Sequence, residues 1–305
     1  MTFPEFPDSR DIFLSDKPIF DEIFAANPPE LSAYTFTNIF AWRASYVFQV
    51  SSLGDYLVIV HHDHEGRKFC WEPLGSGDVR SAILEIFNRI DGQLDFRHIS
   101  AKTAGLIKDC PNLAVEPDRS NFDYLYLADD LINLAGRKFD AKRNFIKRFK
   151  AVNDYQYESI TQETAQECLE FASAWCDERS CETVEGLMRE YNAVSQMLTN
   201  FHALGLFGGA IRVNGKIVAF SLGEAMNPET MVVHVEKADT SFDGLYQLIN
   251  NEFCIHEAQR FKYVNREQDM GIPGLRKAKK SYQPVKMIDS YRIRCANTPS
   301  PEKEV

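Results

Sequence analysis

The densest group of chemically active side chains lies between Asn265 and Tyr282, in the run NREQDMGIPGLRKAKKSY. The run combines acids, amides, cations and two glycines, and it follows an apolar segment typical of a buried strand. A strand that ends, turns through Gly271 to Gly274 and restarts as a short basic helix would line a rigid edge with polar groups. Because sites for anionic substrates are often built at such edges, we expect a binding site here.

The basic part of this run has helical spacing. On a helix from Pro273 to Ser281, three cations share one face: Arg276, Lys279 and Lys280. The opposite face carries Leu275, Ala278 and Tyr282. We expect the first face to bind phosphate and the second to pack against the protein.

The end of the preceding strand supplies further candidates for substrate contacts. Alternation would place Asn265 and Glu267 on one side of the strand and Arg266 on the other. Any of Arg266, Glu267 and Asp269 could reach into a cleft. The alternative is an internal ion pair between Arg266 and Asp269 that only holds the turn.

Two more acids stand near the ends of adjacent predicted strands. Glu224 and Glu236 could converge on one cleft, as a general base or as a pair that binds an ammonium group. Ordinary exposed positions at strand ends are the alternative. Tyr282 could donate a proton to a leaving hydroxyl, or it could simply pack.

The remaining motifs favour neither a metal nor a serine-type hydrolase. The run His61 to Glu65, HHDHE, falls in a predicted hairpin turn that would direct its side chains to opposite sides. We therefore expect no metal site. The sequence contains no Ser/His/Asp order, P-loop or dinucleotide fingerprint.

Charge is unevenly distributed. The chain has a formal net charge of -10 in 305 residues, which argues against a general nucleic-acid coat protein. A local basic stretch nevertheless runs from Arg137 to Lys150, with only Asp140 as an acid. It would bind anionic ligands or form a solvated helix face, and its central cations are Lys142, Arg143, Lys147 and Arg148.

Composition is that of a globular chain with enough apolar material for two cores, at 44% hydrophobic and 26% charged residues. No apolar run approaches the roughly 20 residues of a membrane helix, and the N-terminus lacks the pattern of a signal peptide. We expect a cytoplasmic protein without an integral membrane segment. The seven cysteines are scattered, so we expect reduced thiols. The oligomeric state is not predicted.

Two stretches of the chain share one order of elements. In each, a meander of strands is followed by helix, strand, helix and strand, and an Asn214-Gly215 hairpin turn marks the second meander. This order predicts a duplicated α+β unit. We divide the chain into residues 1–130, a basic bridging helix over 131–154, a second unit over 155–296 and a disordered tail over 297–305.

Four blocks carry a resemblance to a known family: SAYTFTNIFAW, the run from Asn121 to Phe149, NGKIVAFSLGE, and NREQDMGIPGLRKAKKSYQP. With the element order, they resemble the C-terminal domain of phosphatidylglycerol lysyltransferase and, more distantly, the Fem-type aminoacyltransferases. The resemblance implies two tandem acyl-CoA N-acyltransferase (GNAT-like) domains, each a mixed, mainly antiparallel sheet flanked by helices. It places the reacting centre in the second unit.

The resemblance also implies transfer of an acyl or aminoacyl group to an amine or hydroxyl. Simple acetyltransferases bind the coenzyme A pyrophosphate on a glycine-rich loop that opens a helix. The matching stretch, EKADTSFDGLYQL, has only Gly244. This departure is compatible with aminoacyl-tRNA as the donor, with acyl-coenzyme A as the alternative, and it establishes no cofactor.

Lys279 matches the position where Fem-type enzymes hold a lysine near the substrate phosphate and carbonyl, so the resemblance implies a role in stabilising the oxyanion. Arg276 and Lys280 would then contact phosphate. The basic stretch around Lys142 and Arg148 would guide tRNA phosphates.

Three hypotheses follow. The first is an aminoacyltransferase that uses aminoacyl-tRNA and a small-molecule or lipid-linked acceptor. The second is an acyl-coenzyme A dependent N-acyltransferase. The third is a non-catalytic ligand- or RNA-binding scaffold of the same fold.

Overall fold

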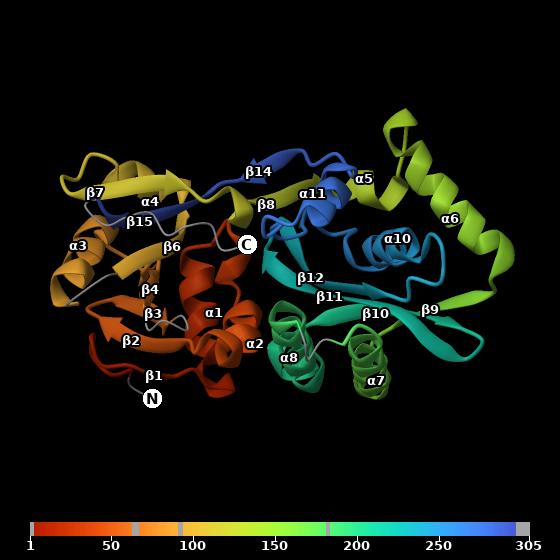
Figure 1. Cartoon of the computed structure of the whole chain (residues 1–305), viewed down its shortest axis with the longest axis horizontal. Coiled ribbons are helices and arrows are strands. Elements are labelled where there is room, and N and C mark those ends of the chain that lie inside the picture. The colour runs from red at the N-terminus through yellow and green to blue at the C-terminus, as the bar shows by residue number, and fades with distance from the viewer. Residues whose placement is uncertain (1–2, 63–66, 91–93, 181–183, 297–305) are drawn as a thin grey trace.

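Two β-sheets side by side form the frame of the protein, in a computed structural model that describes residues 3–62, 67–90, 94–180 and 184–296 (Figure 1). The first sheet has the spatial order β1 (Arg10–Asp11), β2 (Gln49–Leu53), β3 (Tyr56–His62), β4 (Lys68–Trp71), β6 (Leu94–Ser100), β15 (Ser290–Cys295) and β7 (Leu113–Pro117), with β5 (Leu74–Gly75) paired to β3. The second has the order β14 (Lys286–Ile288), β8 (Asp123–Leu127), β13 (Tyr263–Asn265), β12 (Thr230–Ala238), β11 (Lys216–Asn227), β10 (Phe207–Val213) and β9 (Tyr155–Ser159).

Strand direction confirms the predicted class of two mixed, mainly antiparallel sheets. Each sheet has one parallel pair, β4 with β6 and β12 with β13. A helix lies between the two strands of each parallel pair in the chain, α3 (Val79–Arg89) in the first unit and α10 (Leu245–Glu257) in the second. The two units are therefore built on the same plan.

The helices begin where the sequence offers caps. The side chains of Thr35, Asp78, Ser100 and Thr161 each accept a hydrogen bond from a backbone N–H of the first helical turn. Besides α3 and α10, the helices are η1 (Leu14–Asp16), α1 (Lys17–Ala26), η2 (Ser32–Tyr34), α2 (Phe36–Tyr46), α4 (Ala101–Ile107), η3 (Arg119–Asn121), α5 (Ala128–Asn133), η4 (Arg137–Phe139), α6 (Asp140–Val152), α7 (Gln162–Glu178), α8 (Glu185–Thr199), α9 (Phe201–Leu204) and α11 (Pro273–Lys280).

Two strands, β8 and β15, lie in the sheet opposite to the one predicted for them. β8, expected to complete the first unit, lies between β13 and β14 in the second sheet. β15 lies between β6 and β7 in the first sheet. The run VKMIDSYRIR, predicted as one strand, is therefore two strands in different sheets, separated at Asp289. The sheets divide the chain differently from the predicted ranges 1–130 and 155–296, because pairing partners far apart in sequence decide where a strand lies.

One hydrophobic core runs through both units. It joins Phe36 and Ile59 of the first unit to Phe220 and Leu222 of the second, where α2 packs against α8 (Figure 1). Two further cores fill the outer faces, one under α3 and α4 and one under α5, α6 and α10. Because apolar burial is continuous across the junction, the two units are held at a fixed distance and angle.

Two of the sequence-based expectations fall at least partly outside the described residues. Of the HHDHE run, His61 is buried and stacks on Phe69 with ring centroids 4.9 Å apart, whereas residues 63–66 are not described. The predicted tail, 297–305, is also outside them. Across the described part of the chain, no helix combines the length and the apolar character needed to cross a membrane.

A β-bulge interrupts the pairing of β11 with β12. Leu222 pairs with Val235 and Gly223 with Val233, so His234 is an extra residue on β12. Gly223 is required opposite the bulge, because a Cβ there would lie 2.4 Å from the carbonyl oxygen of Val232. The bulge re-aims the side chains of β12 that follow.

Substitution of Gly223 tests this packing. Gly223→Ala is expected to destabilise the protein by about 1–3 kcal/mol, because the methyl group meets rigid backbone. Gly105→Ala is the matched control, since Gly105 is a helical glycine with open space around its Cα. That change should stabilise the protein by roughly 0.5–1 kcal/mol. Urea unfolding of both variants provides the measurement, and equal effects would contradict the assigned role of Gly223.

Candidate active site

The parallel strands β12 and β13 separate beyond their last paired residues, Val232 and Asn265. On its other side, the chain after β13 stays paired to β8, since Arg266 N donates to Tyr124 O (3.0 Å) and Tyr124 N donates to Glu267 O (3.1 Å). Side chains instead of backbone therefore bridge the gap between β12 and the end of β13. This opening is the candidate active site.

His234 occupies the centre of the opening between two carboxylates. Its Nε2 lies 3.0 Å from Glu224 Oε1, and its Nδ1 lies 2.9 Å from Glu267 Oε1. Burial disfavours the imidazolium, but the hydrogen bonds to Glu224 and Glu267 outweigh burial and raise the pKa of His234 to about 9. At neutral pH the group is thus a cation held between two acids.

Glu236 and Arg266 form the second bridge across the opening. Arg266 Nη2 forms an ion pair with Glu236 Oε2, and Asn250 Nδ2 of α10 donates to Glu236 Oε1 at 2.7 Å. The guanidinium also lies over the ring of Tyr282, 4.5 Å from its centroid. Both charged side chains are only 12–15% exposed, so neither is an ordinary surface residue.

Lys279 reaches the same place from α11. Its Nζ donates to the backbone carbonyl of Arg266, and its own carbonyl accepts from Tyr126 Oη at 2.8 Å. Burial, reinforced by the nearby charge of Arg266, lowers the pKa of Lys279 to about 8. An ammonium group has three donor hydrogens, and the carbonyl of Arg266 accepts one of them.

A buried network fixes the loop after β13 to both units. Asp123 accepts from Ser32 N at 2.6 Å, from Ser32 Oγ at 3.0 Å and from Asn265 Nδ2 at 2.9 Å. Asn38 of α2 donates to Glu267 Oε1 at 2.8 Å. Burial raises the pKa of Asp123 to about 6, against the effect of the hydrogen bonds from Asn265 and Ser32. Asn265, predicted as a substrate contact, instead positions the loop.

Asp269 holds the turn that leads into α11. Its carboxylate pairs with Arg276 (2.8 Å) and Arg119 (3.0 Å) and accepts from Tyr124 Oη at 2.7 Å. Burial opposes ionisation of Asp269, but the hydrogen bonds from Arg276 and Tyr124 outweigh it and keep its pKa well below the usual range. The alternative of an internal Arg266–Asp269 ion pair is wrong, because Arg266 pairs with Glu236 instead.

The two faces of α11 differ from the prediction. Arg276 and Lys279 turn inward to Asp269 and to the Arg266 carbonyl, while Leu275 is 40% exposed and Ala278 is also exposed. The reason is the buried polar network beneath the helix, which pairs with cations. Lys280 is exposed, so the three cations do not form one phosphate-binding face.

Strand alternation also fails after β13. Glu267 has a positive φ of 55°, which breaks the pleat, so the neighbouring residues Arg266 and Glu267 both reach β12. Their partners, Glu236 and His234, lie two residues apart on one face of that strand. Glu224 and Glu236, predicted to converge on one cleft, have separate cationic partners: Glu224 pairs with His234 and Glu236 with Arg266.

Tyr282 is buried beneath two cations. Lys142 Nζ lies 3.9 Å from the centroid of its ring, and Arg266 lies on the ring as described above. Burial raises the pKa of Tyr282 far above its ordinary value. This environment fits the packing alternative better than proton donation.

One cation of the basic stretch on α6, Lys142, points into the protein. Lys142 is buried and donates to Ser281 Oγ at 2.6 Å, and burial lowers the pKa of Lys142 to about 8. Its predicted contact with nucleic-acid phosphates is therefore wrong. Lys147 and Arg148 are exposed, and Arg143 is exposed while bonding the carbonyls of Leu134 and Gly136.

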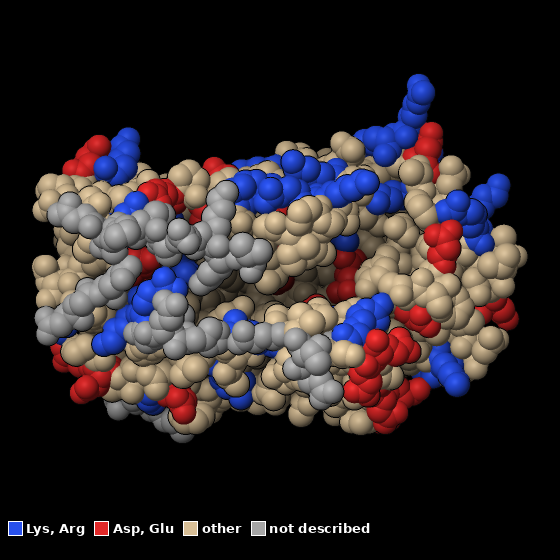
Figure 2. Space-filling view, viewed as in Figure 1, with Lys and Arg blue, Asp and Glu red and all other residues tan. Residues whose placement is uncertain are grey.

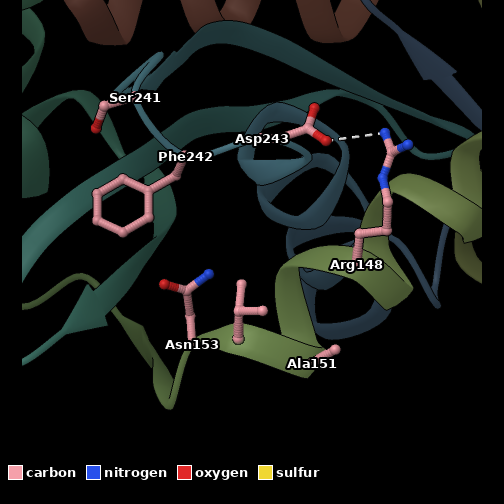
Figure 3. A pocket seen from close by; sticks show the side chains of 7 residues that line it. Arg148, Ala151, Asn153, Ser241, Phe242 and Asp243 are labelled. Carbon is pink, nitrogen blue, oxygen red and sulfur yellow. Dashed lines mark ion pairs between the residues drawn. The ribbon is translucent and has the colours of Figure 1, made fainter.

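The N-terminal end of α10, where the resemblance places a coenzyme A pyrophosphate, packs against α6. A Cβ on Gly244 would lie 2.4 Å from the carbonyl oxygen of Phe145. An open groove of about 620 Å³ lies beside this contact, with Phe242 and Asn153 in its lining and the Arg148–Asp243 ion pair at 2.8 Å (Figure 3). The helix end thus faces α6 instead of a free phosphate cradle.

The equivalent opening of the first unit is filled. Trp71 and Arg97 are the last pair of β4 with β6, and Trp71 packs against Tyr34 and His98 at ring-centroid distances of 5.5 and 4.9 Å. Glu72 accepts hydrogen bonds from Ser100 N and Thr103 Oγ1, both at 2.6 Å. Of the two parallel pairs, the one in the second unit carries the charged network.

The surface is hollowed on the side of this network. Figure 2 shows a hollow below a ridge of Lys and Arg side chains over α11 and β14, with acidic side chains inside it. Glu224, Glu236 and Glu267 retain 12%, 15% and 19% exposure of their side chains. A ligand can therefore reach carboxylates whose partners are buried.

The family model "Phosphatidylglycerol lysyltransferase, C-terminal" matches residues 25–294. The chain belongs to this family. A curated relative, an uncharacterised Mycoplasmoides gallisepticum protein, is 23% identical in an alignment of 188 residues that covers 57% of this chain. The match spans 56%, about half, of that relative's length.

Solved structures agree with the fold. A conserved Bacteroides thetaiotaomicron protein of unknown function is 38% identical, with a TM-score of 0.87 over 94% of this chain and 99% of its own. L-PGS from Bacillus licheniformis has a TM-score of 0.66 at 14% identity, over 99% and 96%. FemX has a TM-score of 0.57 at 8% identity, over 93% and 96%. The fold is thus shared with L-PGS and FemX. Membership of the phosphatidylglycerol lysyltransferase family supports an aminoacyltransferase role.

Several site residues were missed from the sequence. His234 stands in a buried strand, MVVHVEKA, two positions before Glu236, and a lone histidine there was a usable signal. No such sequence signal marks Asn250, Asn38 or Asp123, because the role of each depends on partners far away in the chain.

A pH-dependent stability difference tests the charged state of His234. A histidine with a folded pKa near 9 and an unfolded pKa of about 6.5 stabilises the fold fully below pH 6.5, and this contribution is lost as the pH rises through 9. His234→Gln removes this titrating group. Between pH 6 and pH 9.5, the free energy of unfolding of the wild type should therefore fall by roughly 2–3 kcal/mol relative to that of the variant. Urea unfolding at both pH values measures this difference. A constant difference would mean that His234 is neutral in the folded protein.

Proposed function

We propose that this protein is an aminoacyltransferase that moves an aminoacyl group from aminoacyl-tRNA to an amine or hydroxyl of a small-molecule or lipid-linked acceptor. The observation that carries the proposal is the charged opening between β12 and β13, where Lys279 and Arg266 meet the carboxylates of Glu224, Glu236 and Glu267. Family membership supports the same class of reaction.

In this proposal the acceptor attacks the ester carbonyl carbon of the aminoacyl-tRNA. A new C–N or C–O bond forms, the ester C–O bond to the tRNA ribose breaks, and the ribose hydroxyl leaves with the proton given up by the acceptor. Lys279 stabilises the oxyanion, since its ammonium group is buried and has donor hydrogens to spare. Glu224 receives the proton of the acceptor and passes it to the leaving ribose oxygen, and Glu236 holds Arg266 in position.

Two features bear on the donor. The packing of Gly244 against Phe145 supports aminoacyl-tRNA over acyl-coenzyme A, because the end of α10 is covered by α6. The exposed cations Lys147 and Arg148 on α6 are proposed to contact tRNA phosphates. Transfer with acetyl-coenzyme A as sole donor would instead favour the second candidate, an acyl-coenzyme A dependent N-acyltransferase.

Substitution of Lys279 tests the reaction. Lys279→Met should lower the transfer rate from aminoacyl-tRNA by about 10²–10³, the effect of losing one oxyanion donor. Lys216→Met, at an exposed position in the β10–β11 hairpin, is the matched control and should retain the rate. Transfer of a radiolabelled aminoacyl group to membrane lipid extract and to polyamines gives the measurement. If wild-type protein transfers nothing but binds tRNA, the scaffold alternative replaces the proposal.

The pH dependence of transfer adds a separate test. Because the pKa of Lys279 is about 8, its cationic form prevails below pH 8, and the rate of transfer should fall as the pH rises through 8. Lys279→Arg retains its charge, so its rate should lack this decrease, even if it is lower overall. Single-turnover rates from pH 6.5 to 9, corrected for spontaneous ester hydrolysis, measure both profiles. Identical pH–rate profiles for the wild type and the variant would show that Lys279 takes no part in the reaction.

Binding of tRNA tests the role of α6. Lys147→Ala combined with Arg148→Ala should weaken tRNA binding and reduce the slope of log K against log salt by about 1.4–1.8, since each phosphate contact contributes roughly 0.7–0.9. Lys102→Ala with Lys108→Ala, on and beside α4, is a control with the same change of charge. Filter binding at several salt concentrations measures the slopes. Equal slopes for the two double variants would make α6 an ordinary solvated face.

A further inference from the structure

A continuous line of buried polar contacts runs from the first unit to Glu224. Asn38 Nδ2 of α2 donates to Glu267 Oε1 at 2.8 Å, and the same oxygen lies 2.9 Å from His234 Nδ1. His234 Nε2 in turn lies 3.0 Å from Glu224 Oε1. The imidazole therefore links a side chain of the first unit to the carboxylate that is proposed to receive the proton of the acceptor.

His234 itself is closed to a substrate. Its side chain is 0% exposed, whereas the side chains of Glu224 and Glu267 retain 12% and 19% exposure. Both ring nitrogens are engaged by carboxylates, so neither is free to take a proton from an acceptor. Any part that His234 plays in the reaction must act through Glu224 or Glu267.

The two carboxylate contacts require a proton on each ring nitrogen. An ionised carboxylate only accepts hydrogen bonds, and a neutral imidazole has one donor nitrogen and one acceptor nitrogen. Both carboxylates are satisfied together only by the imidazolium, which donates from both nitrogens. The raised pKa of His234, about 9, agrees with this state. Because both nitrogens are bound, the ring is held in one orientation between the two acids.

The contact with His234 leaves one oxygen of Glu224 open. The Nε2 atom of the ring engages Glu224 Oε1, and no residue in the described part of the chain forms a hydrogen bond with Oε2. A charge-assisted hydrogen bond from a fixed ring restricts the orientation of the carboxylate. An acceptor that enters the hollow would therefore meet Oε2 in a defined direction.

The backbone is shaped to place this ring. His234 is the extra residue of the bulge in β12, while Val233 and Val235 on either side keep their partners on β11. Bulges are frequent next to active sites, where they re-aim a side chain. The distortion thus serves the one polar side chain that lies between the two carboxylates.

We propose that His234 is a positioning residue of the transfer reaction: it holds Glu224 from behind, so that Oε2 faces the acceptor, and it ties this orientation to Asn38 of the first unit. The proposal rests on the proposed function, in which Glu224 receives the proton. It gives the first unit a part in the reaction, because Asn38 fixes Glu267 and Glu267 fixes the ring. Orientation of this kind affects the rate of transfer and leaves binding of the donor unchanged.

A double-mutant cycle on the full chain separates this role from a purely structural ion pair. Single-turnover transfer rates from aminoacyl-tRNA are measured for the wild type, His234→Gln, Glu224→Gln and the double variant. We expect His234→Gln to lower the rate by about 10- to 100-fold, with the Kd for aminoacyl-tRNA unchanged within about twofold. In the Glu224→Gln background the same change should lower the rate by less than about twofold, because a positioning residue acts only through its partner. Losses that multiply in the double variant would overturn the proposal.

Asn38→Ala tests the far end of the line without changing a group that meets the substrate. It should lower the transfer rate by about three- to tenfold and should have no further effect in the His234→Gln variant. Asn251→Ala is the matched control, because Asn251 Nδ2, like Asn38 Nδ2, donates two hydrogen bonds, here to the carbonyls of Leu131 and Ile132. The control should keep the wild-type rate. Equal losses in the two alanine variants, both folded by thermal melting, would overturn the proposal.

Nitrogen-15 NMR of the ring adds a measurement that is independent of activity. In protein labelled on histidine, the signal that His234→Gln removes should report protonation of both ring nitrogens at pH 7. A ring with one protonated nitrogen would overturn the proposal. The kinetic outcomes distinguish it from the proposed function: a wild type that transfers nothing contradicts both together, whereas losses that multiply in the cycle contradict the positioning role alone.

Discussion

The separation of two parallel strands is the constraint on which the site depends. Beyond Val232 and Asn265, β12 and β13 no longer share backbone hydrogen bonds, and buried polar groups there need other partners. The chain provides them as charged side chains: His234 with Glu267, and Glu236 with Arg266. The bulge at His234 and the positive φ at Glu267 are the backbone adjustments that aim these residues at each other.

This arrangement couples the site to the whole molecule. Glu267 is held by Asn38 from the first unit, and Asn265 is held by Asp123, whose other partner is Ser32. The return of β15 to the first sheet and the common core between α2 and α8 hold these contributors in register. In the first unit the equivalent opening is filled by Trp71 and its neighbours. The first unit therefore contributes to the site by fixing the position of residues of the second unit.

The helix α11 links the network to the surface. A short helix normally buries its apolar residues, but the carboxylate of Asp269 and the carbonyl of Arg266 draw its cations inward instead. Removing one partner from a buried ion pair leaves an uncompensated charge at a cost of about 3–5 kcal/mol, which exceeds the gain from burying one leucine. Electrostatics therefore decides the orientation of α11 and leaves Ile272 and Leu275 exposed.

The sequence by itself determined what depends on local patterns. The duplicated order of elements, the mixed sheets, the hairpin at Asn214-Gly215 and the concentration of site residues in Asn265–Tyr282 follow from periodicity, turn chemistry and a resemblance carried by short blocks. Glu224 and Glu236 were predicted at the ends of adjacent strands; the strands β11 and β12 are adjacent, but Glu224 pairs with Val232 and Glu236 with Ser221, inside the two strands. Tertiary structure alone decided the rest. It placed β8 and β15 in the opposite sheets, turned Lys142 and Lys279 inward, paired Arg266 with Glu236 instead of Asp269, and brought His234 between two acids. Each of these outcomes depends on a partner far away in the chain, and helical spacing or strand alternation carries no information about such partners.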